Sequence, residues 1–122
     1  MIKLDHLTLR VSDHRKSRDW YMATLGLKVE FEVPQRPATA LQDDAGFTLF
    51  VEQGPEPPAP GCALYFQVED VEARHRQLTS QGVGFVHGPR TAYWGYGAEL
   101  ADPDGYTIRL WDETSMRDKG GG

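Results

Sequence analysis

Cysteine is nearly absent from this chain. Cys62 is the single cysteine among 122 residues, so neither an internal disulfide framework nor a cysteine-based zinc site is expected. The sequence also has no apolar run approaching ~18 residues, and no basic segment followed by an apolar leader. From these absences we expect no membrane span and no signal peptide, and therefore a cytoplasmic protein.

An excess of basic residues is missing as well. The formal net charge is −5, which disfavours general binding to phosphate backbones, so we expect no nucleic-acid partner. With 39% hydrophobic and 25% charged residues, the composition is that of an ordinary globular chain. A length of 122 residues favours one domain over 1–122.

The strongest local signal present is the turn Asp-Pro-Asp-Gly at 102–105. Proline presets the backbone angle of the second turn position, aspartate can accept hydrogen bonds from the turn, and glycine tolerates a positive φ. The residues that follow, 106–111, alternate between apolar and polar with period two. This alternation predicts a half-buried strand with Thr107, Arg109 and Trp111 on one face.

The chain repeats one order of elements twice. The first half predicts strands at 2–11, 27–33, 40–42 and 47–52, with a helix from Asp13 to about Leu25 that Gly26 ends. The second half predicts a strand at 63–68, a helix over 70–82, a strand at 84–86, a loop through Pro89, and the closing strands on either side of the 102–105 turn. The modules are about 1–54 and 62–115, joined by the proline-rich linker 53–61 and followed by a C-terminal tail, 116–122.

This order resembles the vicinal oxygen chelate superfamily, as do several short motifs. They are Leu-Asp-His-Leu-Thr-Leu at 4–9, the segment from Asp13 to Tyr21, Leu-Gly-Leu at 25–27, and Asp-Pro-Asp-Gly-Tyr at 102–106. The superfamily includes glyoxalase I, extradiol dioxygenases, fosfomycin-modifying enzymes and bleomycin resistance proteins. The resemblance implies an α+β fold in which two βαβββ modules form an open, curved mixed sheet around a groove. It also implies helices on the outside and a homodimer.

Metal-dependent members of the superfamily hold one divalent ion with side chains from four strands. Carried over residue by residue, the pattern places His6, Ala63 and Arg109 at three of these positions. In the fourth strand, one alignment sets Phe50 opposite Arg109 and another makes Glu52 the ligand. Because alanine cannot ligate and a guanidinium repels a cation, we expect no metal and no other cofactor. Arg109 is instead expected to pair with Glu52 or to receive an anionic ligand group in a bidentate fork.

The resemblance assigns several aromatic and polar side chains to the groove. The predicted groove residues are His6, Thr8, Phe50, Glu52, Tyr65, Trp94, Tyr96, Arg109 and Trp111. Aromatic rings with one polar tip suit a flat, amphipathic small molecule, although the same rings could fill the barrel or form a dimer interface. The first hypothesis is therefore a metal-free binding protein resembling the bleomycin resistance branch.

Two other readings stay open at the level of sequence. One is a lyase, isomerase or dioxygenase with a remodelled site, in which His6 and Glu52 are catalytic. They would hold zinc, nickel, iron or manganese with a further carboxylate such as Glu99, or with water; His6 could also be a metal-free base. The other is a small interaction module whose sheets serve only dimerisation. The sequence does not identify the ligand, nor whether modules pair within one chain or by exchange.

Overall fold

A parallel pair of strands forms one side of the first sheet. The strands β1 (His6–Val11) and β4 (Thr48–Gln53) pair in parallel, because α1 (His14–Leu25) carries the chain back before the later strands return. Between β4 and the edge strand β2 (Lys28–Glu32) lies β3 (Ala38–Gln42), antiparallel to both. The resulting order is β1-β4-β3-β2.

The second sheet repeats this arrangement. The parallel pair is β5 (Ala63–Gln67) with β8 (Thr107–Trp111), and their connection contains α2 (Val71–Ser80). Antiparallel to β8 is β7 (Gly95–Ala101), which in turn pairs with the edge strand β6 (His87–Ala92). The order is β5-β8-β7-β6, the same as in the first sheet.

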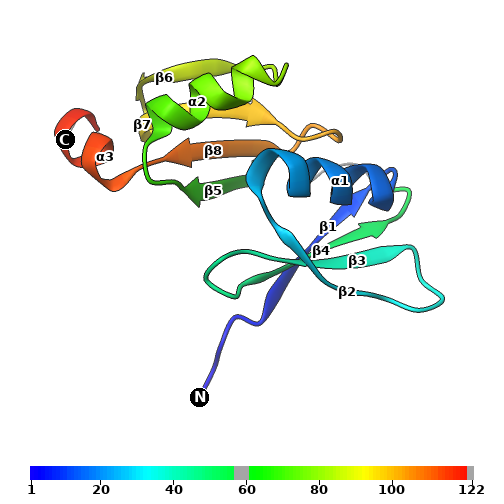
Figure 1. Ribbon diagram of the computed structural model, residues 1–122. Helices are drawn as coiled ribbons and strands as arrows, with labels where there is room; N and C mark the ends of the chain where they lie inside the picture. The colour runs from blue at the N-terminus through cyan, green and yellow to red at the C-terminus, as the bar shows by residue number, and fades with distance from the viewer. Residues whose placement is uncertain (57–60, 121–122) are drawn as a thin grey trace. The chain divides into compact units, whose positions relative to one another are not determined.

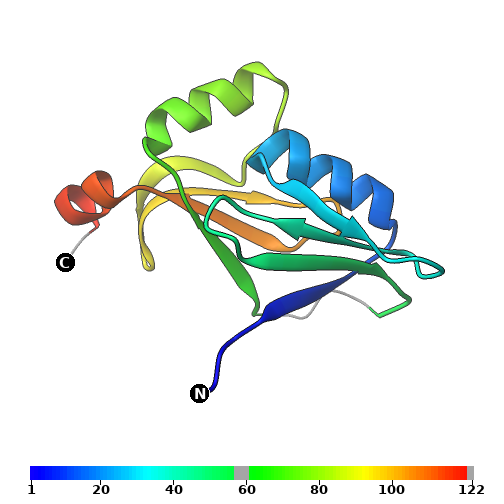
Figure 2. The ribbon, with the colours of Figure 1, turned by 60° about the horizontal axis from the view of Figure 1, so that its bottom comes forward.

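The structure is a computed structural model that describes residues 1–56 and 61–120. It divides into two compact units, Met1–Pro60 and Gly61–Gly122. Each unit is an open, mixed, four-stranded sheet with a helix packed on it, α1 in the first unit and α2 in the second (Figures 1 and 2). The predicted α+β fold of two βαβββ modules is confirmed.

The core of each unit lies between its sheet and its helix. In the first unit Leu9, Val51 and Leu41 are buried on the sheet, and Tyr21 is fully buried on α1. In the second unit the buried side chains from the sheet and from α2 include Tyr96, Ala98, Leu100, Ile108, Leu110, Val71 and Leu78. Burial of one such large apolar side chain contributes about 1.5–3 kcal/mol. The opposite face of each sheet carries the other half of the alternation, which is mixed polar and aromatic.

The two units begin their helices in the same way. Asp13 caps α1 at φ −150° and ψ 105°, and Asp70 caps α2 at φ −149° and ψ 104°. The Asp13 carboxylate accepts from the N–H groups of Arg15 and Lys16, and the Asp70 carboxylate accepts from the N–H of Ala73; these groups would otherwise have no partner within the helix. Gly26 ends α1 in the left-handed conformation, as the sequence predicts.

The last hairpins of the two units also match. Asp102 Oδ1 accepts from the N–H groups of Asp104 and Tyr106, both at 2.9 Å. Asp43 Oδ1 accepts from the N–H groups of Ala45 and Phe47 at 3.0 and 2.8 Å. The glycines that follow have φ of +92° at Gly105 and +88° at Gly46, where a side chain would be strained. The turn that stood out in the sequence is thus one of two copies.

The edge strand of the second unit differs from the prediction. A strand was expected at 84–86 and a loop through Pro89, but β6 is His87–Ala92 and contains this proline. The pairing of β6 with β7 shifts between His87 and Arg90, so Pro89 lies within a bulge. A proline has no N–H for the ladder and is tolerated at a bulge on an edge strand, which explains how β6 accommodates it.

Three other boundaries are corrected. The first strand starts at His6 rather than Ile2, and β3 starts at Ala38 rather than Ala40. The predicted tail lies largely within a third helix, α3 (Glu113–Lys119), which Asp112 caps and which packs against β7. Of the predicted linker and tail, residues 57–60 and 121–122 lie outside the described residues. Among the helices that are described, none has the length and apolarity needed to cross a bilayer.

Candidate functional site

The strand registers define which positions of the two sheets correspond. On the face opposite the helix, the cross-strand row Thr8–Phe50–Ala40–Phe31 runs from β1 to β2. The corresponding row of the second sheet is Tyr65–Arg109–Glu99–His87. Phe50 is therefore the counterpart of Arg109, as the first of the two alignments assumed. Glu52 lies one step further along the same face and corresponds to Trp111.

Arg109 is at the centre of a cluster of aromatic side chains. Its Nε donates to Glu99 Oε1 at 2.9 Å, its Nη1 to the Tyr65 hydroxyl at 2.6 Å and its Nη2 to the Tyr93 hydroxyl at 2.9 Å. The guanidinium carbon lies 5.1–5.4 Å from the ring centroids of Tyr65, Tyr93 and Trp94, within the range of cation–π attraction. We call Arg109, Glu99, Tyr65, Tyr93 and Trp94 the arginine cluster.

Arg109 carries a permanent positive charge, which Glu99 balances. Burial by itself lowers the pKa of Arg109, but the hydrogen bonds to Glu99, Tyr93 and Tyr65 outweigh burial and raise it, so the guanidinium stays charged. Glu99 supplies the opposite charge on the adjacent strand. Both phenol oxygens accept from the guanidinium, so their own protons point elsewhere; in residues 1–56 and 61–120 neither has an acceptor. The cluster therefore offers two O–H donors beside aromatic faces.

These rings are partly open to solvent. Tyr93 is 91% exposed and Tyr65 is 48% exposed. Trp94 meets Tyr65 edge to face, with 5.5 Å between ring centroids, and it lies 6.2 Å from the His87 ring. The sheet approaches Trp94 closely at Gly97, where an added Cβ would lie 2.6 Å from the indole. Glycine at this position thus leaves room for the indole over β7.

The first unit has an aromatic cluster of a different character. The His6 ring lies 4.8 Å from the ring of Phe50, which meets Phe31 edge to face at 5.6 Å. His6 Nδ1 also lies 2.9 Å from Asp5 Oδ2, and this bond lowers the pKa of the Asp5 carboxyl. No charged side chain stands at the position of Arg109, because Phe50 takes its place. Thr8, the counterpart of Tyr65, is exposed beside Phe50.

Glu52 is paired with two arginines of its own unit. Its Oε1 lies 3.0 Å from Arg10 Nη1, and its Oε2 is paired with Arg36 Nη2. The side chain is only 13% exposed, so both carboxylate oxygens are committed at a half-buried position. A Glu52–Arg109 pair was one of two alternatives for these side chains; the structure gives Glu52 two arginines within the first unit and gives Arg109 the carboxylate of Glu99 within the second.

Tyr96 lies on the helix side of its sheet. Its hydroxyl donates to Glu72 Oε1 at 2.5 Å, and Lys119 Nζ is 5.1 Å from its ring centroid. The bond to Glu72, with burial, raises the pKa of Tyr96 to about 12. The structure thus separates Tyr96 from the other predicted groove residues of this unit. Trp111 shares the face of Arg109, two residues further along β8.

The donors do not fit the divalent metal of the superfamily's enzymes. In the described residues no three His, Cys, Asp or Glu side chains converge as a metal site would require. His6 bonds to Asp5, Glu52 is held by two cations, and Arg109 places a positive charge at a ligand position. A metal would have to displace arginines that already neutralise the carboxylate.

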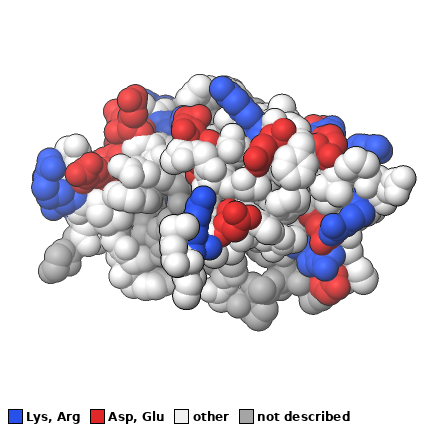
Figure 3. All heavy atoms as spheres, turned by 90° about the horizontal axis from the view of Figure 1, so that it is seen from below, with Lys and Arg blue, Asp and Glu red and all other residues white. Residues whose placement is uncertain are grey.

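Sequence reasoning missed Tyr93, and it considered Glu99 only as a metal ligand. Tyr93 precedes β7, so no strand alternation predicts which way its side chain points. Glu99 has a readable signal: within β7 it alternates with Tyr96, Ala98 and Leu100, so it faces away from the core. Its partner could be found only from the register of β7 with β8. Basic and acidic side chains also lie next to each other on the face drawn in Figure 3, as expected from such pairs.

Comparisons with known proteins agree with this architecture. The family model of the Glyoxalase/Bleomycin resistance protein/Dioxygenase superfamily matches residues 3–110. TnmS3, an antibiotic binding protein from Streptomyces sp. CB03234, is similar with 30% identity and a TM-score of 0.73, over 91% of this chain and 96% of that one. A possible glyoxalase from Bacillus cereus is similar with 23% identity and a TM-score of 0.72, over 90% and 98% of the two chains. The comparison with curated proteins found no match.

Proposed function

The chain belongs to the glyoxalase/bleomycin resistance protein/dioxygenase superfamily, and from this premise we propose that it binds a small, flat, aromatic or amphipathic molecule without a metal. The arginine cluster is the main contact surface. The main observation that supports this proposal is that Arg109 donates hydrogen bonds to the hydroxyls of Tyr65 and Tyr93 while their rings stay exposed. TnmS3, which resembles the chain at 30% identity, is an antibiotic binding protein.

The chemistry of the cluster favours a ligand with acceptor oxygens over a strongly anionic one. Glu99 already neutralises Arg109, so a carboxylate ligand would bring a second negative charge next to it. The two phenol protons can instead donate to carbonyl or ether oxygens. The faces of Trp94, Tyr65 and Tyr93 can stack on a flat ring system, each such contact contributing about 0.5–1.5 kcal/mol. The polar groups then fix the orientation of a ligand that aromatic contacts hold.

Absence of a metal is part of the proposal. The enzymatic alternative, with His6 and Glu52 as ligands or catalytic groups, requires Glu52 to give up Arg10 and Arg36. Elemental analysis after incubation with zinc, nickel, iron or manganese and dialysis tests this directly. A stoichiometric metal that is lost in His6→Ala would overturn the metal-free proposal. A homodimer is likewise proposed, and light scattering coupled to size-exclusion chromatography measures it.

The ligand test uses the fluorescence of Trp94. Planar aromatic antibiotics that carry carbonyl groups are first screened by thermal shift, and hits are titrated while tryptophan emission is recorded. We expect quenching that is lost in Trp94→Phe and kept in Trp20→Phe, because Trp20 is on α1 and contacts Tyr21. Tyr93→Phe removes one donor from an exposed position and should weaken binding about fivefold to tenfold. Equal affinity in all three variants would refute the assignment of the arginine cluster.

A further inference from the structure

A hollow lies outside the arginine cluster, entirely within the first unit. It has a volume of about 660 Å³ and opens between the start of α1 and the connection from β2 to β3. Its lining consists of His14, Arg15, Arg18, Glu32, Val33, Gln35, Arg36, Pro37 and Gln53. None of the residues predicted for the groove is among them, so the hollow is distinct from the predicted groove.

The lining is basic although the chain as a whole is acidic. Three arginines face one carboxylate, Glu32, in a protein whose net charge is −5. Arg18 is paired with Glu32 and Asp19, at 3.3 and 2.9 Å, and Arg36 is paired with Glu52. Arg15 is exposed, and across the described ranges no carboxylate forms an ion pair with it. The hollow thus contains one guanidinium whose charge is not locally neutralised.

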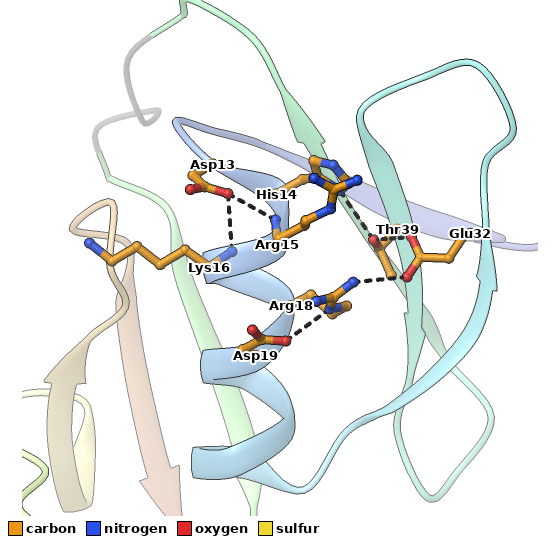
Figure 4. Close-up of polar contacts among 8 residues, drawn as sticks. All are labelled: Asp13, His14, Arg15, Lys16, Arg18, Asp19, Glu32 and Thr39. Atoms are coloured by element: carbon orange, nitrogen blue, oxygen red, sulfur yellow. Dashed lines mark hydrogen bonds and ion pairs between the residues drawn. The ribbon is translucent and has the colours of Figure 1, made fainter.

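A chain of hydrogen bonds fixes how His14 presents its ring. The fully buried Thr39 donates its hydroxyl proton to Glu32 Oε2 at 2.6 Å. The contact of 3.3 Å between Thr39 Oγ1 and His14 Nδ1 then has to be donated by the histidine. In the neutral ring Nε2 is then an acceptor, and it becomes a donor to an anion only when the imidazole is protonated. Figure 4 shows His14, Thr39, Glu32 and Arg18 converging from α1 and the two strands.

An amide and a charged acid complete the polar lining. Gln53 Oε1 accepts from the His14 N–H at 3.2 Å, which leaves the amide nitrogen of Gln53 as a donor. The bond from Thr39, opposed by burial and supported by Arg18, lowers the pKa of Glu32, so this carboxylate remains a fixed anchor for Arg18. A hollow of this size accommodates more than a bare inorganic anion. Its donors are suited to anionic oxygens carried on an organic body.

We propose that this hollow is a second ligand site, which takes a small organic anion through its phosphate or carboxylate oxygens. Arg15 contacts the anionic group, the Gln53 amide and protonated His14 can add further donors, and Arg18, held by Glu32, borders it. The site is independent of the arginine cluster, so it can exist whether or not the proposed function is correct.

The test is a set of titrations monitored by backbone amide resonances. Adenosine monophosphate and citrate represent the two anion types, and adenosine is the uncharged control. We expect at least one anion to shift the amide signals of His14, Arg15, Arg18, Gln35 and Arg36, while adenosine shifts none of them. A shift caused equally by adenosine would overturn the proposal, as would the absence of any shift at these residues with both anions.

The chain offers a matched pair of variants on one helix. Arg15→Gln removes the charge that faces the hollow, and Lys16→Gln removes the same charge from the next residue, which does not line it. In Figure 4 the Lys16 side chain extends away from the other labelled side chains. Both residues are exposed, so both variants should fold. Arg15→Gln should lower the affinity for the anion at least about tenfold. Lys16→Gln should leave that affinity nearly unchanged. Equal weakening by both would show a diffuse charge effect and overturn the site.

Discussion

Glu99 and Arg109 stand directly opposite each other on β7 and β8, and the Arg109 Nε donates to Glu99 Oε1 at 2.9 Å. Their side chains are only 20% and 12% exposed, so the pair is largely shielded from water. The arginine thus stands on an open sheet face without carrying uncompensated charge. Its other nitrogens are free to organise Tyr65 and Tyr93.

Removal of the Glu99 charge should therefore destabilise the fold. In Glu99→Gln the guanidinium loses its carboxylate at a mostly buried position, and we expect a loss of about 1–3 kcal/mol in the free energy of unfolding. Urea denaturation measures it. Asp19→Asn is the control, because the Asp19 side chain of the Arg18–Asp19 pair is exposed. This substitution should lower the free energy of unfolding by less than about 0.5 kcal/mol. Equal small losses in both variants would contradict a structural role for Glu99.

Gly97 should tolerate no side chain. A Cβ at this position would collide with the backbone oxygen of Leu110 and lie 2.6 Å from the indole of Trp94. Gly97→Ala should cost about 1–3 kcal/mol, as overpacked sites do, and should shift the emission of Trp94. Gly84→Ala is the matched control, because nothing lies within 4 Å of an added Cβ there. Unchanged stability and emission in Gly97→Ala would show that Trp94 does not pack on β7 as described.

Tyr96 should make the protein sensitive to strongly alkaline solution. Its pKa is raised to about 12 from 10.0, chiefly by the hydrogen bond to Glu72. A pKa that is higher in the folded state gives stability that is complete below pH 10 and is lost as the pH rises toward 12. Tyr96→Phe should be less stable by about 1 kcal/mol at pH 8, and the difference should shrink above pH 10. Urea midpoints at several pH values test this; a constant difference up to pH 11.5 would contradict it.

Asp112 should contribute stability at neutral pH that acid removes. Burial opposes its ionisation, but bonds from the N–H groups of Val71 and Ser115, at 2.7 and 2.6 Å, outweigh burial and lower its pKa below 3.8. A lowered pKa in the folded state gives stability that is present above the unfolded value and lost as the pH falls through the folded value. Asp112→Asn should cost about 1–2 kcal/mol at pH 7, with a smaller cost below pH 3. Chemical denaturation at both pH values measures the change, and a pH-independent cost would argue against the ionised cap.

Much of the fold could be predicted because its signals are local. The aspartate caps, the turn glycines and the period-two alternation each act over a few residues, and they define the repeat of elements. The strand β6 escaped prediction because its sequence, His-Gly-Pro-Arg-Thr-Ala, contains a proline and lacks apolar alternation. The third helix was missed although Asp112, Glu113, Arg117 and Lys119 are typical of helix ends.

The candidate site was less predictable because it depends on long-range register. The alternation of β8 places Arg109 on the polar face of its strand, but its carboxylate partner Glu99 is identified only by the pairing of β7 with β8. Tyr96 was placed in the groove although it alternates with the buried Ala98 and Leu100, which puts it on the helix side. The glycines on either side of Tyr96 have no side chains, so they obscure that alternation in the sequence.

The matched rows of the two sheets also bear on how the halves came to differ. Where the second half has Glu99 opposite Arg109, the first has Ala40 opposite Phe50. A single substitution in the first row would leave an unpaired charge on a half-buried sheet. Arginine at position 50 alone would lack a carboxylate, and glutamate at position 40 alone would lack a guanidinium. Divergence at this row is therefore a two-residue step, and a graft of Arg109 onto position 50 would have to bring an acid at position 40 with it.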